Sequence, residues 1–327
     1  MESFRAFRIF EDNGKVEGRV VPATLDELSA GDVVIRTVAS SVNYKDALAG
    51  TGAGKIIRRF PLIGGIDVAG TVASSADPRC REGEPVLVTG YDLGVAHDGG
   101  YAGLVRVPAD WVVSIPPGLS PHDAMAIGTA GFTAALSIVD LELNGLAPGQ
   151  GPVIVTGATG GVGSVAVQLL AARGYQVTAL TGKDHEHDFL RSLGASAVLS
   201  RNGLQLGTKP LEKPLWAGAV DVAGGETLAW LTRTMMYNAS IACSGLTGGT
   251  DLRTTVLPFI LRGLKLLGID SVMCPPEKRR EVWRRLATDL RPDELQTIVR
   301  EIGLDQLPAA FATLLKGEAR GRFVVRV

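Results

Sequence analysis

The sequence predicts an α/β protein that joins a partly closed β domain to a doubly wound parallel sheet. Short β-branched runs separated by Gly, Pro and Asp fill the first 120 residues, which indicates a strand-rich domain. From residue 151 to about 270, predicted strands alternate with predicted helices, which is typical of a parallel sheet covered on both faces. A glycine cluster at residues 157–163 connects one of these strands to its helix. A sheet of this kind binds its ligand at the carboxyl ends of its strands.

The composition fits a compact protein of about two domains. The chain has 327 residues, 46% of them hydrophobic, and a formal net charge of −1. This balance provides no attractive field for nucleic acid or for an anionic membrane, so we expect neither partner. The three cysteines are far apart, which predicts no disulfide framework and a reducing compartment. Charged residues interrupt positions 1–14, which excludes a signal peptide, and we expect a cytoplasmic protein.

The first domain is predicted from strands and ends at a helix. β-branched runs predict strands at residues 33–38, 86–88 and 112–115. Ser120 and Pro121 are typical of a helix start, with serine as the N-cap and proline in the first turn. The composition that follows predicts a helix to about residue 146.

The glycine cluster predicts a Rossmann dinucleotide site. An apolar strand at 152–157 leads into it, and a helix with an apolar face leaves it. Gly160 allows the backbone to approach a pyrophosphate, Gly163 allows the helix to pack closely on the strand, and Ala158 takes the place of the usual first glycine. The free amides at the helix start then face the phosphates. The uncharged stretch 143–172 would also suit a membrane span, but its central glycines argue against one.

The rest of the second domain continues the alternation, and the chain then returns to the first domain. We expect an amphipathic helix that carries Val282, Leu286 and Leu290, a helix near 308–315, and a last strand at 323–327 that joins the first domain. The predicted substrate domain is therefore 1–122 with 293–327, and the predicted nucleotide-binding domain is 123–292. Its further strands are expected at 176–180, 197–199, 219–222, 240–244 and 265–269, and its helices at 185–192 and 227–234.

The end of the second predicted strand of this domain favours NADPH over NADH. NAD-specific folds place a carboxylate at this tip to hold the ribose diol. Here the strand ends with Thr181, Gly182 and Lys183, so a cation is available for a 2′-phosphate. Arg201, after the next strand, is a second candidate. Asp184 weakens the argument, and the alternative is that Lys183 is an ordinary loop lysine.

Longer motifs narrow the prediction. The segments at 40–48, 65–72, 127–134, 254–262 and 268–272, with Leu193-Gly194-Ala195 after the second helix, resemble the medium-chain dehydrogenase/reductase superfamily. Within it they are similar to the bacterial acrylyl-CoA reductase group, which also goes under the name of quinone oxidoreductases. The resemblance spans essentially the whole chain. It implies that the first domain is GroES-like, and relatives of this group are often homodimers, with the strand near 265–269 as the edge that could pair.

The resemblance also implies the cofactor contacts. The pyrophosphate would lie on the glycine loop, the adenosine end on the tip of the second strand, and the nicotinamide half along residues that are far apart in the sequence. The implied residues are Tyr44, Thr159, Gly160, Gly161, Val162, Thr181, Gly182, Lys183, Arg201, Leu246, Ile260 and Ser271.

Zinc ligands are missing from the positions where zinc-dependent members carry them. Those members have a cysteine in the segment that here holds Asn43, and Gly-His-Glu where this chain has Gly65-Ile66-Asp67. Without thiolate and imidazole ligands we predict no metal site. Because alcohol oxidation in this family uses the metal as a Lewis acid, its absence favours reduction of activated double bonds or quinones.

The favoured function is NADPH-dependent reduction of acrylyl-CoA or a close small enoyl-CoA to propanoyl-CoA. The alternatives are an NADPH:quinone oxidoreductase and a non-catalytic NADPH-binding sensor. Tyr44 is the candidate catalytic group, since a phenol ordinarily stays protonated at neutral pH and can donate a proton, and Asn43 would orient substrate or cofactor. The competing interpretation is that Tyr44 only packs on the nicotinamide while water supplies the proton.

A CoA ester carries phosphates, so cations near the site are of interest. Lys55, Arg58 and Arg59 follow the glycine-rich stretch 50–54, and we hypothesise that they meet the CoA phosphates. The alternative is a solvated surface loop.

Overall fold

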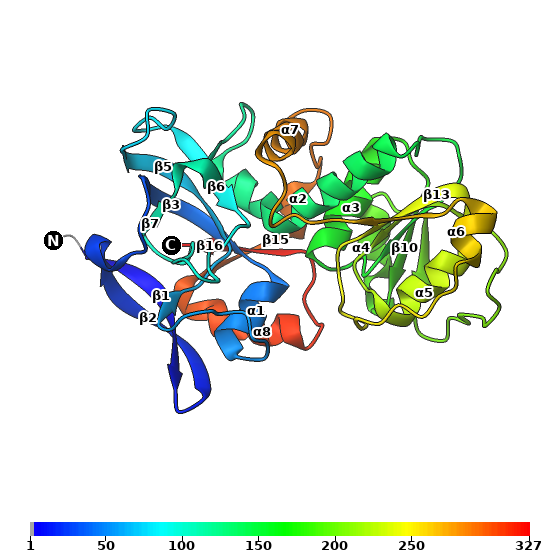
Figure 1. The fold of residues 1–327 in the computed structure, drawn as a ribbon, viewed down its shortest axis with the longest axis horizontal. Coiled ribbons are helices and arrows are strands. Elements are labelled where there is room, and N and C mark those ends of the chain that lie inside the picture. Colours follow the sequence, from blue (N-terminus) through cyan, green and yellow to red (C-terminus); the bar gives the residue numbers. More distant parts are fainter. Residues whose placement is uncertain (1–2) are drawn as a thin grey trace. The chain divides into compact units, whose positions relative to one another are not determined.

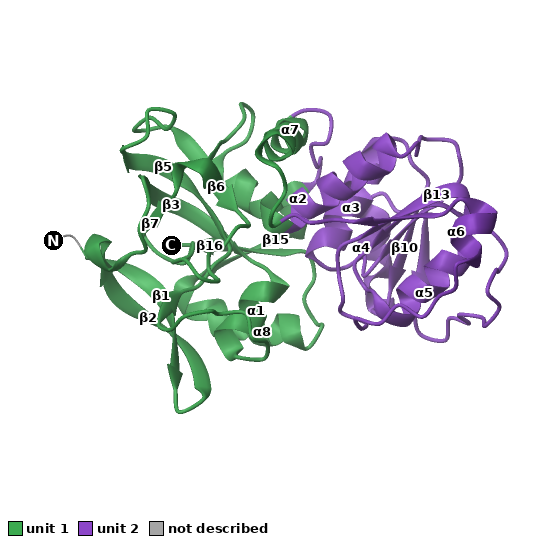
Figure 2. Cartoon of the chain, in the orientation of Figure 1, with its two compact units in different colours: residues 1–129, 272–287, 295–327 green, residues 130–271, 288–294 purple. Residues whose placement is uncertain are grey.

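The computed structural model describes residues 3–327 and divides the chain into two compact units (Figures 1 and 2). The first contains residues 1–129, 272–287 and 295–327, and the second contains 130–271 and 288–294. The structure thus groups segment 272–287 with the first unit, whereas the division predicted from the sequence placed it in the second. Residues 323–326 of the C-terminal segment pair with residues 39–42 in the first unit.

The first unit is built on two β-sheets. A seven-stranded sheet has the order β15-β16-β3-β5-β6-β8, with β7 also paired to β3, and a three-stranded sheet has the order β2-β1-β4. Neighbouring strands are antiparallel except for β15 and β16, which are parallel. The strands are β1 (Ser3–Asp12), β2 (Lys15–Thr24), β3 (Val33–Val42), β4 (Leu62–Ile63), β5 (Asp67–Ser75), β6 (Pro85–Thr89), β7 (Leu104–Val107), β8 (Val113–Ser114), β15 (Val299–Gly303) and β16 (Arg322–Arg326).

Two helices from opposite ends of the chain lie side by side against the first unit's aromatic core. These are α1 (Tyr44–Thr51) and α8 (Leu307–Leu315) (Figure 1). The ring of Phe311 lies 5.8 Å from that of Phe7 and 6.4 Å from that of Tyr101. A Cβ at Gly50 would come within 2.3 Å of the Phe311 ring, so only glycine permits this approach of α1. The short 3-10 helices of the unit are Leu25–Glu27, Ala109–Trp111, Leu295–Ile298 and Leu304–Gln306.

Helix α7 (Pro276–Leu286) belongs to the first unit and ends before Leu290, earlier than the predicted amphipathic helix. Its Arg279 is buried. The guanidinium donates to the backbone oxygens of Thr89 and Val272 at 2.8 and 2.9 Å, and lies over the Tyr91 ring. A buried arginine thus anchors the returning chain to the β-sheet.

Helix α2 (Pro121–Leu143) is interrupted at Gly128, whose φ of 53° and ψ of −163° are not helical. The division between the units falls directly after this break, at Thr129. The helix is long and apolar enough to cross a membrane, but 89% of its most apolar window is buried inside the protein. Its hydrophobicity is therefore that of a core helix.

The second unit is a six-stranded parallel sheet with the order β11-β10-β9-β12-β13-β14. Counted within this unit, the third strand, β11, lies at one edge and the sixth, β14, lies at the other, as in a Rossmann fold. Helices cover both faces, with α3 on one and α5 on the other (Figure 1). The elements are β9 (Val153–Thr156), α3 (Gly161–Ala172), β10 (Val177–Thr181), a 3-10 helix (Asp184–Glu186), α4 (His187–Ser192), β11 (Ala197–Ser200), β12 (Trp216–Asp221), α5 (Gly225–Thr234), β13 (Met235–Cys243), α6 (Leu257–Arg262) and β14 (Lys265–Gly268).

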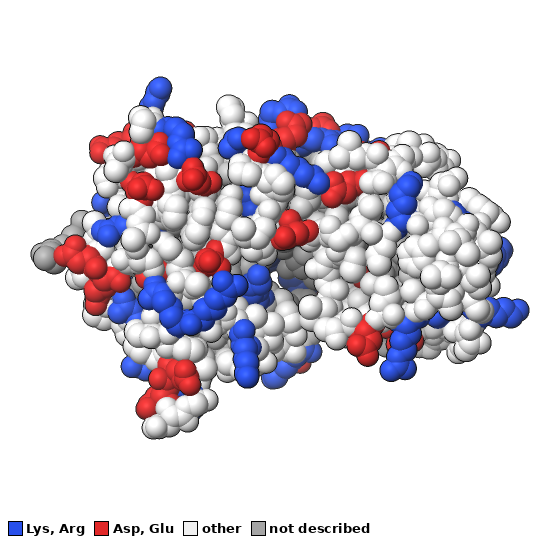
Figure 3. Space-filling view, viewed as in Figure 1, with Lys and Arg blue, Asp and Glu red and all other residues white. Residues whose placement is uncertain are grey.

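Acidic and basic side chains are interspersed over the visible face of the first unit, and the visible face of the second carries few charges (Figure 3). This agrees with the net charge of −1.

Candidate functional site

Tyr44 is the first residue of α1, and its side chain is 39% exposed. The preceding residue, Asn43, is the N-cap of the helix and is buried. The backbone amide of Asn43 donates to Oδ2 of Asp46 at 2.8 Å, which closes the first turn. The other carboxylate oxygen of Asp46 accepts from the amide of Ile66 at 2.9 Å. Asp46 therefore ties the start of α1 to the segment before β5, and so holds the backbone that carries Tyr44.

Beneath Asn43 lies a buried carboxylate, Asp67, which opens β5 and is completely enclosed. Its Oδ2 accepts from Nδ2 of Asn43 at 2.8 Å, from the hydroxyl of Ser41 at 2.5 Å and from the amide of Thr129 at 2.9 Å. Its Oδ1 accepts from the hydroxyl of Thr129 at 2.5 Å. Both oxygens of this buried carboxylate therefore have hydrogen-bond donors.

The positive partner of this cluster is Arg322, the first residue of β16, which is only 2% exposed. Its Nη1 donates to Oδ1 of Asn43 at 3.2 Å, and its Nη2 donates to the Ser41 hydroxyl at 2.8 Å. The same Nη2 lies 3.9 Å from Oδ2 of Asp67. The amide of Asn43 is thus held at both ends, by an acceptor on one side and a cation on the other.

Gly128 closes this network from α2. A Cβ at this position would lie 2.4 Å from Nη2 of Arg322, 2.6 Å from the Ser41 hydroxyl and 2.7 Å from Oδ2 of Asp67. No side chain fits there, and the positive φ suits glycine. The break in α2 and the buried network therefore depend on the same residue.

The carboxyl group of Asp46 has its pKa raised to about 7, mainly by burial and further by the negative charge of Asp67. Hydrogen bonds from Asn43 and Ile66 oppose this rise. Tyr101, whose hydroxyl donates to the carbonyl oxygen of Ser41 at 3.1 Å, has a pKa raised well above its usual value by burial and by the same two acids. The raised pKa of Asp46 brings its loss of a proton near neutral pH.

In the second unit, the glycine loop has the geometry that its sequence predicts. Gly157 follows β9 with a φ of 56°, and Gly160 is the N-cap of α3. A Cβ on Gly163 would lie 2.4 Å from the Gly157 carbonyl oxygen, so glycine is needed for the helix to pack on the strand end. A Cβ on Gly160 would meet only the Gly157 oxygen, at 3.4 Å, which leaves the backbone open to a ligand. The loop fits a pyrophosphate at a helix N-terminus.

The next two strands bring the predicted 2′-phosphate residues together. Thr181 ends β10, and its carbonyl oxygen accepts from the amide of Arg201 at 2.7 Å. The hydroxyl of Thr181 accepts from the amide of Lys183 at 3.0 Å. The Arg201 guanidinium lies against Gly182, where an added Cβ would be 2.9 Å from Nη2. Two cations thus adjoin the tip of β10.

Three further predicted cofactor residues lie in separate parts of the second unit. Leu246 follows β13 and is 57% exposed, and Ser271 follows β14. Ile260 is 69% exposed on α6, whose last residue, Arg262, donates to the carbonyl oxygen of Met235 at the start of β13. Their roles toward a cofactor stay predictions.

Two of the three cations assigned to CoA already have partners within the first unit. Arg58 lies 3.1 Å from a carboxylate oxygen of Asp92. Arg59 lies 3.1 Å from Oδ2 of Asp98, which is buried, and also donates to the carbonyl oxygen of Ala96 at 2.9 Å. Lys55 is exposed. These ion pairs would compete with a phosphate, so the proposed contact stays a prediction.

No role was predicted for Asp67, Arg322, Ser41 or Thr129. Asp67 belongs to the segment Gly65-Ile66-Asp67, which lacks the zinc ligands. An acidic residue at the start of an apolar strand could have indicated a buried carboxylate. Arg322 is 279 residues away from Asn43 in the chain, and no pattern in the sequence around either residue links the two.

The residues at the expected zinc positions do not fit the metal. The Asn43 amide nitrogen faces carboxylates as a donor, and the Ile66 side chain is apolar and buried. No group of three or more His, Cys, Asp or Glu side chains within residues 3–327 is arranged to hold a metal ion. The donor chemistry at this site is therefore not that of a zinc centre.

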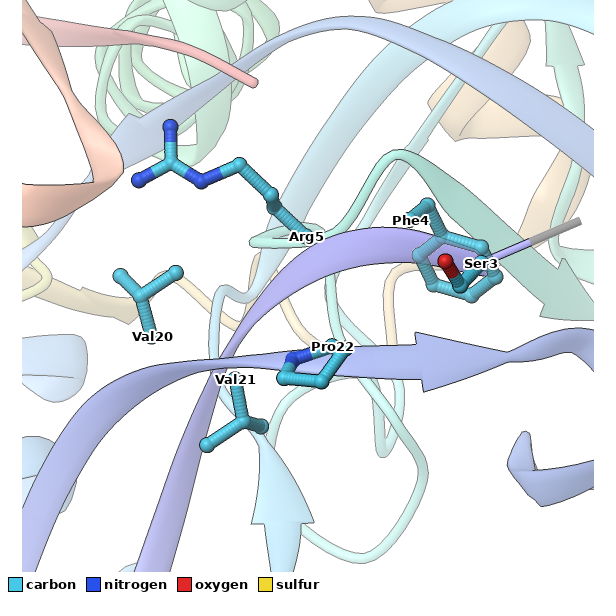
Figure 4. A pocket seen from close by; sticks show the side chains of 6 residues that line it. All are labelled: Ser3, Phe4, Arg5, Val20, Val21 and Pro22. Atoms are coloured by element: carbon cyan, nitrogen blue, oxygen red, sulfur yellow. The ribbon is translucent and has the colours of Figure 1, made fainter.

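A surface depression of about 360 Å³ lies elsewhere, between the adjacent strands β1 and β2 (Figure 4). The cation among its lining residues, Arg5, forms an exposed ion pair with Asp305. The depression has none of the predicted site residues. Its lining residues are Ser3, Phe4, Arg5, Val20, Val21 and Pro22.

Comparison with known proteins identifies both units. Residues 29–117 match the alcohol dehydrogenase GroES-like domain, and residues 161–288 match the zinc-binding dehydrogenase domain. YhfP from Bacillus subtilis, whose name provisionally places it among the quinone oxidoreductases, is 50% identical over 326 residues, which cover 99% of each chain. Its crystal structure with NAD bound superposes with a TM-score of 0.97 and covers 100% of both chains at 49% identity.

Two further relatives are similarly close. The acrylyl-CoA reductase AcuI of Ruegeria pomeroyi is 48% identical over 318 residues, which cover 97% of this chain and 96% of AcuI. The yhdH oxidoreductase of Salmonella enterica, crystallised with NADP, is 48% identical with a TM-score of 0.97, and the match covers 99% of each chain. From these matches and the fold, the chain is an oxidoreductase that belongs to the medium-chain dehydrogenase/reductase superfamily.

Proposed function

We propose that this enzyme reduces the C=C bond of acrylyl-CoA, or of a close small enoyl-CoA, to give propanoyl-CoA, with NADPH as the reductant and without zinc. The observation that supports NADPH as the cofactor is the cationic tip of β10. There the Arg201 guanidinium lies against Gly182, and Lys183 is the next residue. The substrate class is supported by the likeness to AcuI over almost the whole chain.

The residues of the second unit fit the two ends of NADPH. Thr159, Gly160, Gly161 and Val162 would hold the pyrophosphate at the start of α3, where the backbone is open. Thr181 to Lys183, with Arg201, would hold the adenosine end. One relative was crystallised with NADP and another with NAD, so the choice depends on local charge. Two cations at this tip favour the phosphorylated form.

When bound, NADPH supplies a hydride to the β carbon of the conjugated thioester. Negative charge then develops on the thioester oxygen, and a proton must reach the α carbon. Tyr44 has a hydroxyl that can donate to this oxygen or deliver the proton, and its position is set by the Asn43–Asp46 turn. The buried network orients the side-chain amide of Asn43 toward Asp67 and Arg322. These contacts hold the Asn43–Asp46 turn in place.

The cofactor assignment is tested by the ratio of kcat/KM for NADPH over that for NADH. A ratio well above one is expected, and a ratio near or below one contradicts the assignment. Replacing Lys183 by alanine should lower this ratio, because one of the two cations is lost. Lys316, a lysine of the other unit, provides the control substitution.

A second candidate is an NADPH:quinone oxidoreductase, which the likeness to YhfP favours. The third is an NADPH-binding sensor without turnover. Steady-state oxidation of NADPH with acrylyl-CoA, crotonyl-CoA and a benzoquinone separates the three. Preference for acrylyl-CoA supports the reductase, preference for the quinone supports the second candidate, and binding without turnover supports the third.

The contact of Lys55, Arg58 and Arg59 with the CoA phosphates is part of this proposal. Replacing all three by alanine should raise the KM for the CoA ester and leave that for NADPH unchanged. Because Arg58 and Arg59 also pair with Asp92 and Asp98, the melting temperature is measured in parallel. A loss of stability without a change in KM contradicts the contact.

We also propose a cytoplasmic homodimer formed through β14, the edge strand of the second unit's sheet. An edge strand exposes unpaired backbone groups that a second copy can satisfy. Leu266 on this strand is exposed, as are Ile260 and Leu261 on the neighbouring helix α6. Light scattering on L266D should show a shift from dimer to monomer if this edge is the interface.

A further inference from the structure

The loop that follows β10 contains two opposite charges next to each other, Lys183 and Asp184. A carboxylate near this tip is the group that NAD-specific folds use to bind the ribose diol. Close to a 2′-phosphate, the same carboxylate would weaken binding by repulsion. The position of the Asp184 carboxylate therefore matters to the choice of cofactor.

Asn202 holds this carboxylate together with Ser200. Its side-chain amide, Nδ2, lies 3.2 Å from Oδ2 of Asp184 and 3.1 Å from the carbonyl oxygen of Gly182. The other carboxylate oxygen of Asp184 lies 3.7 Å from Nε2 of His187. Hydrogen bonds from Ser200 and Asn202 lower the pKa of Asp184, so the held group is an anion at neutral pH.

Asn202 is itself fixed by the end of β11. Its backbone amide donates to the hydroxyl of Ser200 at 3.0 Å. The preceding amide, that of Arg201, donates to the carbonyl oxygen of Thr181 at 2.7 Å. One short segment thus places the Arg201 guanidinium against Gly182 and the Asn202 amide on the acid.

We propose that Asn202 is a specificity-determining positioning residue. By bonding both Gly182 and Asp184, it directs the carboxylate toward β11 and leaves the tip of β10 to the cations Arg201 and Lys183. The inference rests on the proposed use of NADPH and adds Asn202 as the residue that weakens the binding of NADH. Its role is exerted through Asp184 and needs no contact with the cofactor.

The test uses the full-length protein and measures dissociation constants for NADPH and NADH by fluorescence titration, without substrate. N202A should lower the preference for NADPH by about fivefold, since a carboxylate held only by Ser200 is freer to repel the 2′-phosphate and to reach the ribose. D184N should keep the wild-type preference or raise it. In the double variant N202A/D184N, the preference should return to that of D184N.

D188N is the matched control, because Asp188 is an exposed carboxylate on α4 that pairs with Arg191 instead. It should leave the preference unchanged. If N202A weakened both cofactors equally, or lowered the preference as much in the D184N background, Asn202 would only support the loop and the inference would be overturned.

The outcomes also separate this inference from the proposed function. A wild-type protein that prefers NADPH, with N202A unchanged, overturns the inference alone. A wild-type protein that binds neither cofactor, or binds both equally, overturns the cofactor assignment and the inference with it.

Discussion

Arg322 and Asp67 form a buried pair in which Nη2 of the guanidinium lies 3.9 Å from Oδ2 of the carboxylate, with the Ser41 hydroxyl bonded to both. Neither side chain is more than 2% exposed. Burial without partners would cost each group several kcal/mol, so the pair depends on the surrounding donors and acceptors.

Replacing Arg322 by methionine should destabilise the protein by about 3–5 kcal/mol, because Asp67 then keeps a buried charge without its cation. The unfolding free energy from urea denaturation measures this. R326M is the control on the same strand, since Arg326 is 74% exposed and pairs with Glu301 at the surface. It should cost no more than about 1 kcal/mol. Equal losses in the two variants would contradict the role given to the buried pair.

Replacing Tyr44 by phenylalanine removes the hydroxyl and keeps the ring. If the hydroxyl supplies the proton, kcat should fall by about a hundredfold with near-normal NADPH binding. Steady-state kinetics and a cofactor titration measure the two quantities. Y237F, at a tyrosine that is 70% exposed in the second unit, serves as the control. Unchanged kcat in Y44F would leave Tyr44 as a packing residue, with water as the acid.

Replacing Gly128 by alanine should destabilise the protein more than the same change at Gly145. Both glycines have positive φ, at 53° and 99°, so both variants carry backbone strain of about 1–2 kcal/mol. Only Gly128 would add a collision, with Arg322, Ser41 and Asp67, since Gly145 has open space around it. Thermal melting of both variants makes the comparison. Similar melting temperatures would mean that the network yields to the added methyl group.

The raised pKa of Asp46 predicts a pH dependence of stability. In the folded protein this group binds its proton with a pKa of about 7, whereas in the unfolded chain it does so near 3.9. The folded state therefore holds the extra proton between these values, and stability from this group falls as pH rises through 7. Urea denaturation of the wild type at pH 5.5 and 8 should show the decrease.

D46N supplies the reference for this measurement, because its side chain does not titrate. The difference in unfolding free energy between wild type and D46N should become less favourable to the wild type at pH 8 than at pH 5.5. A difference that stays constant with pH would show that Asp46 remains in one protonation state throughout this range.

Much of the fold could be predicted because the spacing of apolar residues and the glycines and prolines that end helices and strands are local features of the sequence. The strand before Gly157, the helix after Gly160 and the alternation that follows are all visible in short windows of sequence, and the structure confirms them. The end of α7 at Leu286 could not be predicted, because Leu290 continues the apolar spacing and remains buried after the helix has ended.

The buried network was beyond a local prediction for a different reason. Its residues come from four separate segments of the chain, and they are Asn43, Asp67, Thr129 and Arg322. Arg322 reaches Asn43 only because β16 pairs with β3. The choice of cofactor was visible in part, since Lys183 and Arg201 are cations at strand ends. The hydrogen bond from Asn202 to Asp184 was not, because a side-chain contact between two loops leaves no pattern in the sequence.

The place of β16 in the sheet has a consequence for biosynthesis. This strand lies between β15 and β3, so residues 322–326 supply an interior strand of a sheet that also contains residues 33–42. Residues 130–271 emerge as a continuous run and can complete their own sheet while translation continues. The strands within residues 33–114 are made earlier, but they must wait for residues 299–326 before the seven-stranded sheet is assembled.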